Sequence, residues 1–553
     1  MASEWVNLLV DEGLLSARQL EQAVALSRER NESLVKTLVR QGVVPEEKLL
    51  RVVARQQGLG FVSFRDTRPE ASAVASLSAR FVAHYRIMPV KLEGNRLTIA
   101  VSNLFDQAAV EDIESSQGYR VERVLACEAD ILEAIRIHFG VGSETVERIL
   151  ADMPEQGTGQ ALQESHDLEH KAEDASVVKL VNQLLHQAIT DRATDIHFEV
   201  YRDDIILRRR IDGVLYDTTV SKNMTSLYPA IISRIKLMAG LNIVERRLPQ
   251  DGRARVNIGH LQYDLRVSVV PSVHGENIVI RILPTSMLFS LEQLGLSPGH
   301  SKILMDLIQL PHGIVFVTGP TGSGKSTTLY ACLTRLNTRD HKIITIEDPV
   351  EYEIKGIMQT QVNPRIDLTF ARALRSMLRH DPDIMMVGEV RDRETAEITI
   401  QTALTGHLVF STLHTNDAAS AAIRLLDMGV DPYLIASTVR AFMAQRLVRV
   451  VCEHCREWFD FNGRRCSRGR GCTQCNGTGY RGRVAISEIL QLFPEIQDLI
   501  LRRASARDIR QKAVSMGMQT LAGDGWEKIT QGITTVEEVS RVTFDTLTNV
   551  DSP

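Results

Sequence analysis

Nine consecutive residues have the types and spacing needed to bind phosphate. They are Gly319, Pro320, Thr321, Gly322, Ser323, Gly324, Lys325, Ser326 and Thr327. The glycines allow backbone conformations closed to residues with a Cβ, so successive N–H groups can converge on phosphate oxygens at a helix N-terminus. Lys325 can reach the β- and γ-phosphates, and the Ser326 hydroxyl suits Mg²⁺. The stretch therefore predicts a nucleotide phosphate loop.

The flanking residues provide the elements that such a loop requires. The apolar, β-branched run at 314–317 fits a buried strand, and residues 327–333 fit a helix. A chance glycine-rich turn is the alternative, but it would not be expected between a strand and a helix. Nucleotide binding is therefore predicted, although the process that the nucleotide drives is not.

Carboxylates follow two further apolar runs. Residues 343–346 lead into Glu347, Asp348 and Glu351, and residues 384–387 lead into Glu389. In a parallel nucleotide-binding sheet, side chains at the C-terminal ends of the strands face the ligand. We expect one carboxylate to support Mg²⁺ and another to orient or deprotonate the attacking water.

Four of the seven cysteines form two Cys-x-x-Cys pairs. The pairs are Cys452 with Cys455 and Cys472 with Cys475, within a predicted insert at 450–480. Four thiolates complete a tetrahedral shell with no open position for water, so the pattern predicts a structural zinc ion rather than a catalytic one. Metal binding also fits a reducing compartment better than disulfides do.

Length and charge limit the remaining possibilities. A chain of 553 residues should hold three or four domains, and its net charge of −5 provides no global basic field for nucleic acid. No run of about eighteen apolar residues occurs, so we expect no membrane span and a cytoplasmic protein.

The chain order predicts a front module, a linker and two α/β domains. Residues 1–140 combine a weak helical repeat with a small α/β unit and are expected to dock partners; 141–174 are acidic and poor in apolar residues, as in a flexible linker. Residues 175–287 form a second α/β domain, and 288–553 form the nucleotide-binding domain. Residues 484–553 are predicted to be its C-terminal helices.

Two arginines in the second domain lie on predicted neighbouring strands. Arg266 is within 263–270, and Arg281 ends the strand at 277–281. Both could reach across a cleft to a γ-phosphate. Surface ion pairs are the alternative for both.

Three ordered motifs resemble those of the type II secretion and type IV pilus assembly ATPases. Residues 347–351 are similar to that family's Asp box, 388–392 to its atypical Walker B motif, and 405–416 to its His box. The resemblance implies that Glu351 is the general base and that Glu389 holds Mg²⁺ through water. It also implies that His414, with His407, senses the γ-phosphate. The arginines implied to clamp phosphate are Arg266, Arg281, Arg375 and Arg379. A hydrogen-bonded core histidine is the alternative for each histidine.

The resemblance also implies an architecture and a function. It implies a RecA-like P-loop ATPase domain preceded by a PAS-like α/β domain, in a homohexamer that uses ATP, Mg²⁺ and Zn²⁺. Domain closure would power pseudopilus assembly for protein export, through the cytoplasmic domain of an inner-membrane platform protein. The tetracysteine insert accompanies secretion and pilus-extension members of the family. A pilus extension ATPase is one alternative, and a nucleic-acid motor or regulatory nucleotide-binding module is another.

Some members of this family bind a cyclic dinucleotide through arginine and glycine positions in the N-terminal repeat. Here those positions are Glu4, Val6, Ser33 and Val35. We therefore expect no cyclic-dinucleotide binding, which favours secretion over pilus extension.

Overall fold

The computed structural model divides into two compact units, Met1–Leu283 and Pro284–Pro553, which are described separately. It describes residues 15–30, 34–41, 44–64, 66–103, 107–140, 145–146, 174–202, 204–220, 224–258, 261–284 and 290–543. Except for residues 145, 146 and 174, the predicted linker lies outside the described residues. The repeat positions Glu4, Val6 and Ser33 also lie outside them.

The first part of unit 1 has helices and a four-stranded sheet of order β1-β4-β3-β2. The helices are α2 (Ala17–Arg30), α3 (Leu34–Arg40), α4 (Glu46–Gln56), α5 (Ala71–Ala75), α6 (Ala79–Tyr85), α7 (Ala108–Ser116) and α8 (Glu128–Phe139). The strands are β1 (Gly60–Phe61), β2 (Met88–Glu93), β3 (Arg96–Val101) and β4 (Arg120–Leu125). Strands β2 and β3 form an antiparallel pair around the turn at 93–95.

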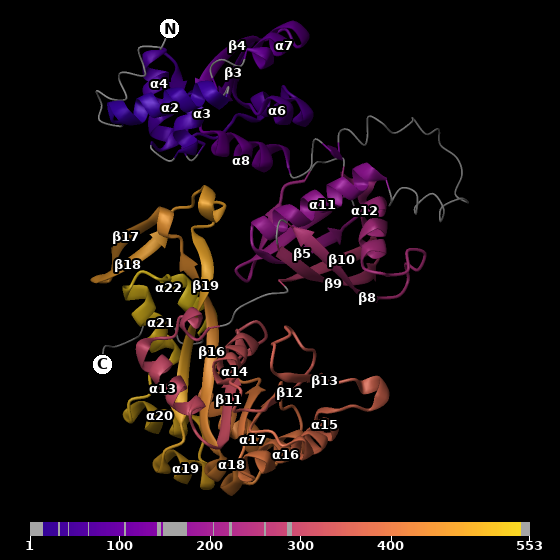
Figure 1. Ribbon diagram of the computed structural model, residues 1–553, viewed down its shortest axis with the longest axis vertical. Coiled ribbons are helices and arrows are strands. Elements are labelled where there is room, and N and C mark those ends of the chain that lie inside the picture. The colour runs from indigo at the N-terminus through magenta and orange to yellow at the C-terminus, as the bar shows by residue number, and fades with distance from the viewer. Residues whose placement is uncertain are drawn as a thin grey trace. The chain divides into compact units, whose positions relative to one another are not determined.

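The second part of unit 1 is a six-stranded sheet of order β7-β6-β5-β10-β9-β8 with helices α11 and α12 packed on it (Figure 1). The helices are α11 (Ala175–Thr190) and α12 (Met224–Met238), and the strands are β5 (Ala193–Val200), β6 (Ile205–Ile211), β7 (Val214–Thr218), β8 (Gln250–Ile258), β9 (Leu261–Ser272) and β10 (Gly275–Pro284). In β9 and β10 buried and less buried residues alternate, so one face of the sheet meets the helices and the other is more open.

Unit 2 is built on a seven-stranded sheet of order β13-β12-β14-β15-β11-β16-β19. The strands are β11 (Gly313–Thr318), β12 (Ile343–Glu347), β13 (Met358–Gln361), β14 (Ile384–Val387), β15 (Leu408–Leu413), β16 (Val439–Val451) and β19 (Tyr480–Gln491). Every pairing in it is parallel except β16 with β19. Strands β11, β12, β14 and β15 are buried along their whole length, as expected where helices cover both faces.

Two hydrophobic clusters cover the sheet of unit 2, one including α13 and α14 and the other including α15 to α22. The helices are α13 (Pro298–Ile308), α14 (Lys325–Leu336), α15 (Phe370–Met377), α16 (Arg393–Leu404), α17 (Ala418–Asp427), α18 (Pro432–Thr438), α19 (Pro494–Leu501), α20 (Ala506–Ser515), α21 (Leu521–Thr530) and α22 (Val536–Val542). This arrangement is an α/β fold, as predicted.

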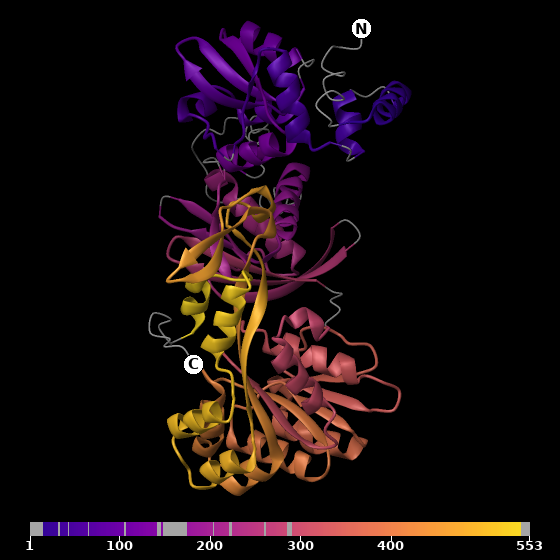
Figure 2. The ribbon, with the colours of Figure 1, turned by 90° about the vertical axis from the view of Figure 1, so that its left-hand side faces the viewer.

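The prediction that residues 484–553 are helical is wrong for their first part. Residues 484–491 belong to β19, which runs antiparallel beside β16 through a long pairing before α19 begins (Figure 1). Helices α21 and α22 then pack along this pair of strands, in yellow in Figure 2. A short apolar run does not distinguish a buried strand from a buried helix by periodicity, which explains the error.

Between β16 and β19 the chain forms a small hairpin. Its strands are β17 (Arg456–Phe461) and β18 (Arg464–Gly469), and they lie between the two Cys-x-x-Cys pairs. The predicted insert at 450–480 therefore projects from the two longest strands of unit 2.

Candidate active site and metal centre

The phosphate loop connects β11 to α14, as the sequence predicts. Gly322 and Gly324 have φ values of +79° and +88°, in the left-handed region that favours glycine. A Cβ on Gly319 would lie 2.5 Å from Ser323 Oγ and 2.6 Å from the Gln445 carbonyl oxygen. Ser326 and Thr327 are exposed at the start of the helix. The loop backbone therefore requires glycine for both conformation and close packing.

Lys325 folds back over the loop. Its Nζ donates to the carbonyl oxygens of Gly319 at 2.7 Å and Pro320 at 3.2 Å. Burial lowers the pKa of Lys325 to about 8; Glu389 opposes this shift and Arg446 adds to it. The ammonium group is thus placed among the loop carbonyls and is ready to exchange them for phosphate oxygens.

Glu389 follows β14 and has one carboxylate oxygen without a hydrogen-bond partner in the part of the chain that the structure describes. Its side chain is 12 % exposed; Oε2 lies 2.7 Å from Arg391 Nε and 3.6 Å from His414 Nε2. Oε1 is buried and accepts no hydrogen bond from the described residues. A buried, unsatisfied carboxylate oxygen near a phosphate-loop lysine fits a Mg²⁺ site, because Mg²⁺ prefers oxygen ligands and retains several waters.

Glu347 has a structural role in this arrangement. Its carboxylate accepts hydrogen bonds from Tyr330, from Thr345 Oγ1 at 2.6 Å and from Gln359 Nε2 at 3.0 Å. Burial and this carboxylate raise the pKa of Tyr330 far above its usual range. Because three donors occupy Glu347, it is a poor candidate for proton transfer.

Glu351 lies in the segment that follows β12. Its backbone N–H donates to Tyr330 Oη at 3.2 Å. Tyr330 therefore connects α14, which begins at the phosphate loop, to the segment that carries the predicted general base. The sequence analysis missed this connection, which only the fold reveals.

The two predicted histidines lie at opposite ends of β15. His414 follows the strand, at the end where Leu413 pairs with Thr318 just before the phosphate loop. Burial and Lys325 lower the pKa of His414, although Glu389 opposes the shift. His407 precedes the strand beside Gly313, and its Nδ1 lies 2.9 Å from the Thr402 carbonyl oxygen.

The placement of His407 corrects its assignment. Six strand residues span roughly 20 Å, so His407 lies too far from its own chain's phosphate loop to contact a nucleotide there. Its ring is hydrogen-bonded, as in the alternative, but the residue is only partly buried and does not lie in the core.

The structure does not bring the predicted arginines of unit 2 to the loop. Arg375 Nη2 lies 2.6 Å from Glu394 Oε1, and Arg379, in the 3₁₀ turn Leu378–His380, donates to the Arg375 carbonyl oxygen at 2.9 Å. Both guanidinium groups are therefore engaged by partners outside the phosphate loop.

In unit 1, Arg266 and Arg281 share the more open face of the six-stranded sheet. Arg281 is 57 % exposed, and its Nε lies 3.2 Å from Asp195 Oδ1, so the alternative of a surface ion pair is realised for it. Arg266 lies opposite Arg253 in the β8–β9 register. The sequence analysis did not identify Arg253 as the neighbour of Arg266, because the register between strands is not visible in a sequence.

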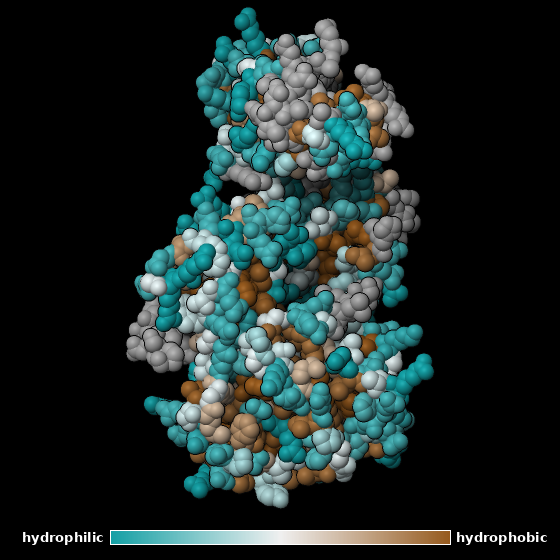
Figure 3. Space-filling model, turned by 60° about the vertical axis from the view of Figure 1, so that its left-hand side comes forward, coloured by the Kyte–Doolittle hydropathy of each residue, from teal (hydrophilic) through white to brown (hydrophobic). Residues whose placement is uncertain are grey.

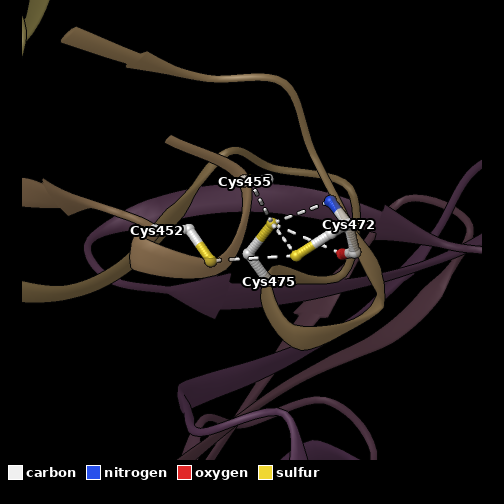
Figure 4. Close-up of side chains that lie close together, drawn as sticks. All are labelled: Cys452, Cys455, Cys472 and Cys475. Atoms are coloured by element: carbon white, nitrogen blue, oxygen red, sulfur yellow. Dashed lines mark hydrogen bonds between the residues drawn. The ribbon is translucent and has the colours of Figure 1, made fainter. Parts of the chain in front are cut away.

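The four cysteines converge as predicted (Figure 4). The Sγ atoms of Cys452 and Cys472 are 3.8 Å apart, those of Cys455 and Cys475 are 3.9 Å apart, and those of Cys472 and Cys475 are 3.7 Å apart. A tetrahedron with Zn–S bonds of about 2.3 Å has S–S edges of about 3.8 Å. The backbone N–H groups of Cys472 and Gly479 also point at Cys475 Sγ, at 3.2 Å and 3.3 Å. The cluster therefore fits a tetrahedral metal ion.

The chain also matches a known family model over most of its length. Residues 170–541 match the model described as "Type II/IV secretion system protein". The chain belongs to this family. Residues 57–145 match the MshEN domain, so this part of the front module is also of a known type.

Named relatives come from both branches of the family. The chain is 39 % identical to the type IV pilus assembly ATPase PilB of Myxococcus xanthus and 41 % identical to the type II secretion system protein E of Xanthomonas campestris, each over 98 % of both chains. Among solved structures, it resembles the Legionella pneumophila ATPase DotB with a TM-score of 0.50 and 25 % identity, over 65 % of this chain and 94 % of that one. Family membership together with the phosphate loop makes this chain an ATP-hydrolysing enzyme, as predicted.

No helix among the described residues is long and apolar enough to cross a membrane. On the face drawn in Figure 3, hydrophilic residues are spread widely among smaller hydrophobic areas.

Proposed function

We propose that this chain is the homohexameric ATPase that powers pseudopilus assembly in type II secretion. The observation that carries the proposal is the gathering of Lys325, Glu389 and His414 at one end of the parallel sheet, in a family of secretion ATPases. Nucleotide-driven closure of the preceding α/β domain on this site would supply the mechanical step. We propose that the nucleotide-binding domain (288–553) is RecA-like and that the preceding domain (175–287) is PAS-like.

Each site residue has a proposed task. Lys325 and the loop N–H groups hold the β- and γ-phosphates, while Ser326 and, through water, Glu389 hold Mg²⁺. When bound, Mg²⁺ neutralises charge on the phosphate oxygens. Glu351 takes the proton of the attacking water, and His414 contacts the γ-phosphate.

The arginines are proposed to act when the nucleotide is bound. Arg266 and Arg281 lie on the more open sheet face, and Arg281 is 57 % exposed, so its guanidinium can turn toward phosphate. Its buried partner Asp195 would keep Arg210, whose Nε lies 3.8 Å from Asp195 Oδ2. Arg375 and Arg379 have the same proposed role, after release from their present partners.

We propose that the tetracysteine cluster holds Zn²⁺ as a structural ion. The S–S distances of 3.7–3.9 Å support zinc, and the four sulfurs leave no ligand position open for catalysis. Zinc measured by mass spectrometry should fall from one ion per chain to a small fraction in Cys452→Ser/Cys455→Ser. An unchanged zinc ratio would count against the site.

The partner proposed for the ring is the cytoplasmic domain of an inner-membrane platform protein, which would keep the ATPase at the membrane through protein contacts alone. A type IV pilus extension ATPase is the second candidate, favoured by the full-length similarity to PilB. The front module would dock the partner, and cyclic-dinucleotide binding is not expected of it.

The deciding experiment is a pull-down with soluble cytoplasmic domains of platform proteins from both systems. Retention of the secretion platform alone supports the first candidate, and retention of the pilus platform alone supports the second. ATPase assays provide the enzymatic test: Lys325→Ala should lose hydrolysis, whereas Glu351→Gln should bind ATP without turnover. Near-normal turnover in Glu351→Gln would refute its assignment as the base.

A further inference from the structure

Strand β16 places a glutamine directly behind the phosphate loop. It runs parallel to β11, and Thr318 pairs with Ala444 in their register. Gly319, which follows the end of β11, therefore lies beside Gln445 of β16. Gln445 is 1 % exposed, so its carboxamide is fully withdrawn from water.

The carboxamide joins two separate parts of the nucleotide site. Its Nε2 donates to the Ser323 carbonyl oxygen at 3.0 Å, and its Oε1 accepts from Thr328 Oγ1 at 2.7 Å. Ser323 lies within the loop, while Thr328 lies in the first turn of α14 and is fully buried. The Gln445 side chain thus binds both the phosphate loop and the helix α14 that follows the loop.

The Ser323 contact also determines where a phosphate-binding donor points. In a trans peptide the C=O and the following N–H point in opposite directions within one plane. Because Gln445 holds the Ser323 carbonyl toward β16, the N–H of Gly324 points away from β16. That is the side on which a loop before a helix N-terminus receives phosphate.

Two of the loop glycines fit against the same residue. A Cβ on Gly324 would lie 2.7 Å from Gln445 Nε2, and a Cβ on Gly319 would lie 2.6 Å from the Gln445 carbonyl oxygen. A Cβ on Gly322 would meet nothing within 4 Å. The glycines at 319 and 324 therefore allow the loop to lie against β16, while Gly322 lies on the open side.

We propose that Gln445 is a positioning residue that holds the phosphate loop in its nucleotide-binding shape. It does not touch the nucleotide; it orients the backbone that does. This inference rests on the ATP binding within the proposed function. The position requires a donor and an acceptor on one planar group, which glutamine supplies and glutamate does not.

The test compares four variants with the intact chain by titration of a non-hydrolysable ATP analogue and by ATPase kinetics. Gln445→Glu keeps the shape but places a carboxylate oxygen against the Ser323 carbonyl, and Gln445→Met removes both hydrogen bonds. Thr328→Val removes only the hydroxyl donor, whereas Thr328→Ser keeps a hydroxyl at this position.

We expect the dissociation constant to rise at least about tenfold in Gln445→Glu and Gln445→Met, which corresponds to about 1.4 kcal/mol. Thr328→Ser should retain more affinity than Thr328→Val. The change should appear mainly in KM, because a distorted loop binds less nucleotide, with a smaller effect on kcat.

Gln497→Glu is the matched control. Gln497 also donates through Nε2 to a main-chain carbonyl, that of Leu492 at 2.9 Å, but it lies in α19, which follows the end of β19 that pairs with the start of β16. Gln497→Glu and the intact chain should bind and hydrolyse ATP equally well. If neither protein binds ATP, the result contradicts the proposed function rather than the role of Gln445. An unchanged affinity in folded Gln445→Glu, or an equal loss in Gln497→Glu, would overturn the role of Gln445.

Discussion

The depressed pKa of Lys325 makes nucleotide affinity depend on pH in a calculable way. Burial lowers this pKa from 10.5 to about 8 in the nucleotide-free chain. Bound phosphates favour the charged ammonium and should return the pKa toward its ordinary value. Binding therefore takes up protons. Affinity is close to its maximum at pH 7 and below, and it falls as pH rises through about 8.

The magnitude follows from the fraction of Lys325 that is protonated before binding. With a free pKa of about 8, roughly 90 % is charged at pH 7 and roughly 10 % at pH 9. If only the charged form binds well, the apparent dissociation constant rises about tenfold between these values. About half a proton should be taken up per nucleotide at pH 8.

Isothermal titration calorimetry with a non-hydrolysable ATP analogue measures both quantities, with two buffers of different ionisation enthalpy at each pH and constant ionic strength. Lys325→Arg is the control, because a guanidinium stays charged throughout this range. His414 is not expected to interfere, since its pKa is already below 6.5. A wild-type dissociation constant that changes less than twofold from pH 7 to 9, with no proton uptake, would refute this explanation.

Three further perturbations test other parts of unit 2. Glu389→Gln should weaken Mg²⁺-dependent nucleotide binding roughly tenfold and leave binding without Mg²⁺ nearly unchanged, as titrations with and without the metal would show. Gly319→Ala should reduce ATP affinity more than Gly322→Ala, because both positions have positive φ values that disfavour alanine but only the Cβ at 319 would also meet protein atoms; equal losses would contradict the packing argument. Burial raises the pKa of Glu538, but hydrogen bonds from two arginines overcome this and lower it to about 2. Its contribution to stability is thus present above pH 4.5 and lost as pH falls toward 2. Glu538→Gln should lower unfolding free energy at pH 7 by at most about 3 kcal/mol, and the difference from the wild type in denaturant titrations should shrink below pH 4.5.

The sequence predicted local elements well where chemistry and pattern coincide. The phosphate loop and the convergence of four cysteines both follow from residue types at fixed spacing. Thr535 caps α22, accepting from the Glu538 N–H at 3.3 Å, while the Glu538 carboxylate binds Arg449 on β16.

Other features depend on strand order, which no local pattern encodes. His407 and His414 belong to one motif in the sequence, yet a whole strand separates them. Gln445 lies 120 residues beyond Lys325 and reaches the phosphate loop only because β16 pairs with β11. Sequence spacing thus identifies which residues can do chemistry, whereas the register of the sheet decides which of them meet.

The β16–β19 pair relates the two functional centres of unit 2. Gln445 supports the phosphate loop from the middle of β16, and Cys452 follows the end of the same strand, where its N–H donates to the Gly479 carbonyl oxygen at 2.9 Å. Across from Gln445, β19 carries Ser487 and the neighbouring Glu488, whose buried carboxylate accepts the Ala418 N–H at 2.7 Å, just beyond the His414 segment. Because two cysteines follow β16 and two precede β19, a metal ion would tie these strands together at one end. The same strands contact both sides of the nucleotide site, so one continuous pair of strands joins the tetracysteine centre to the phosphate loop.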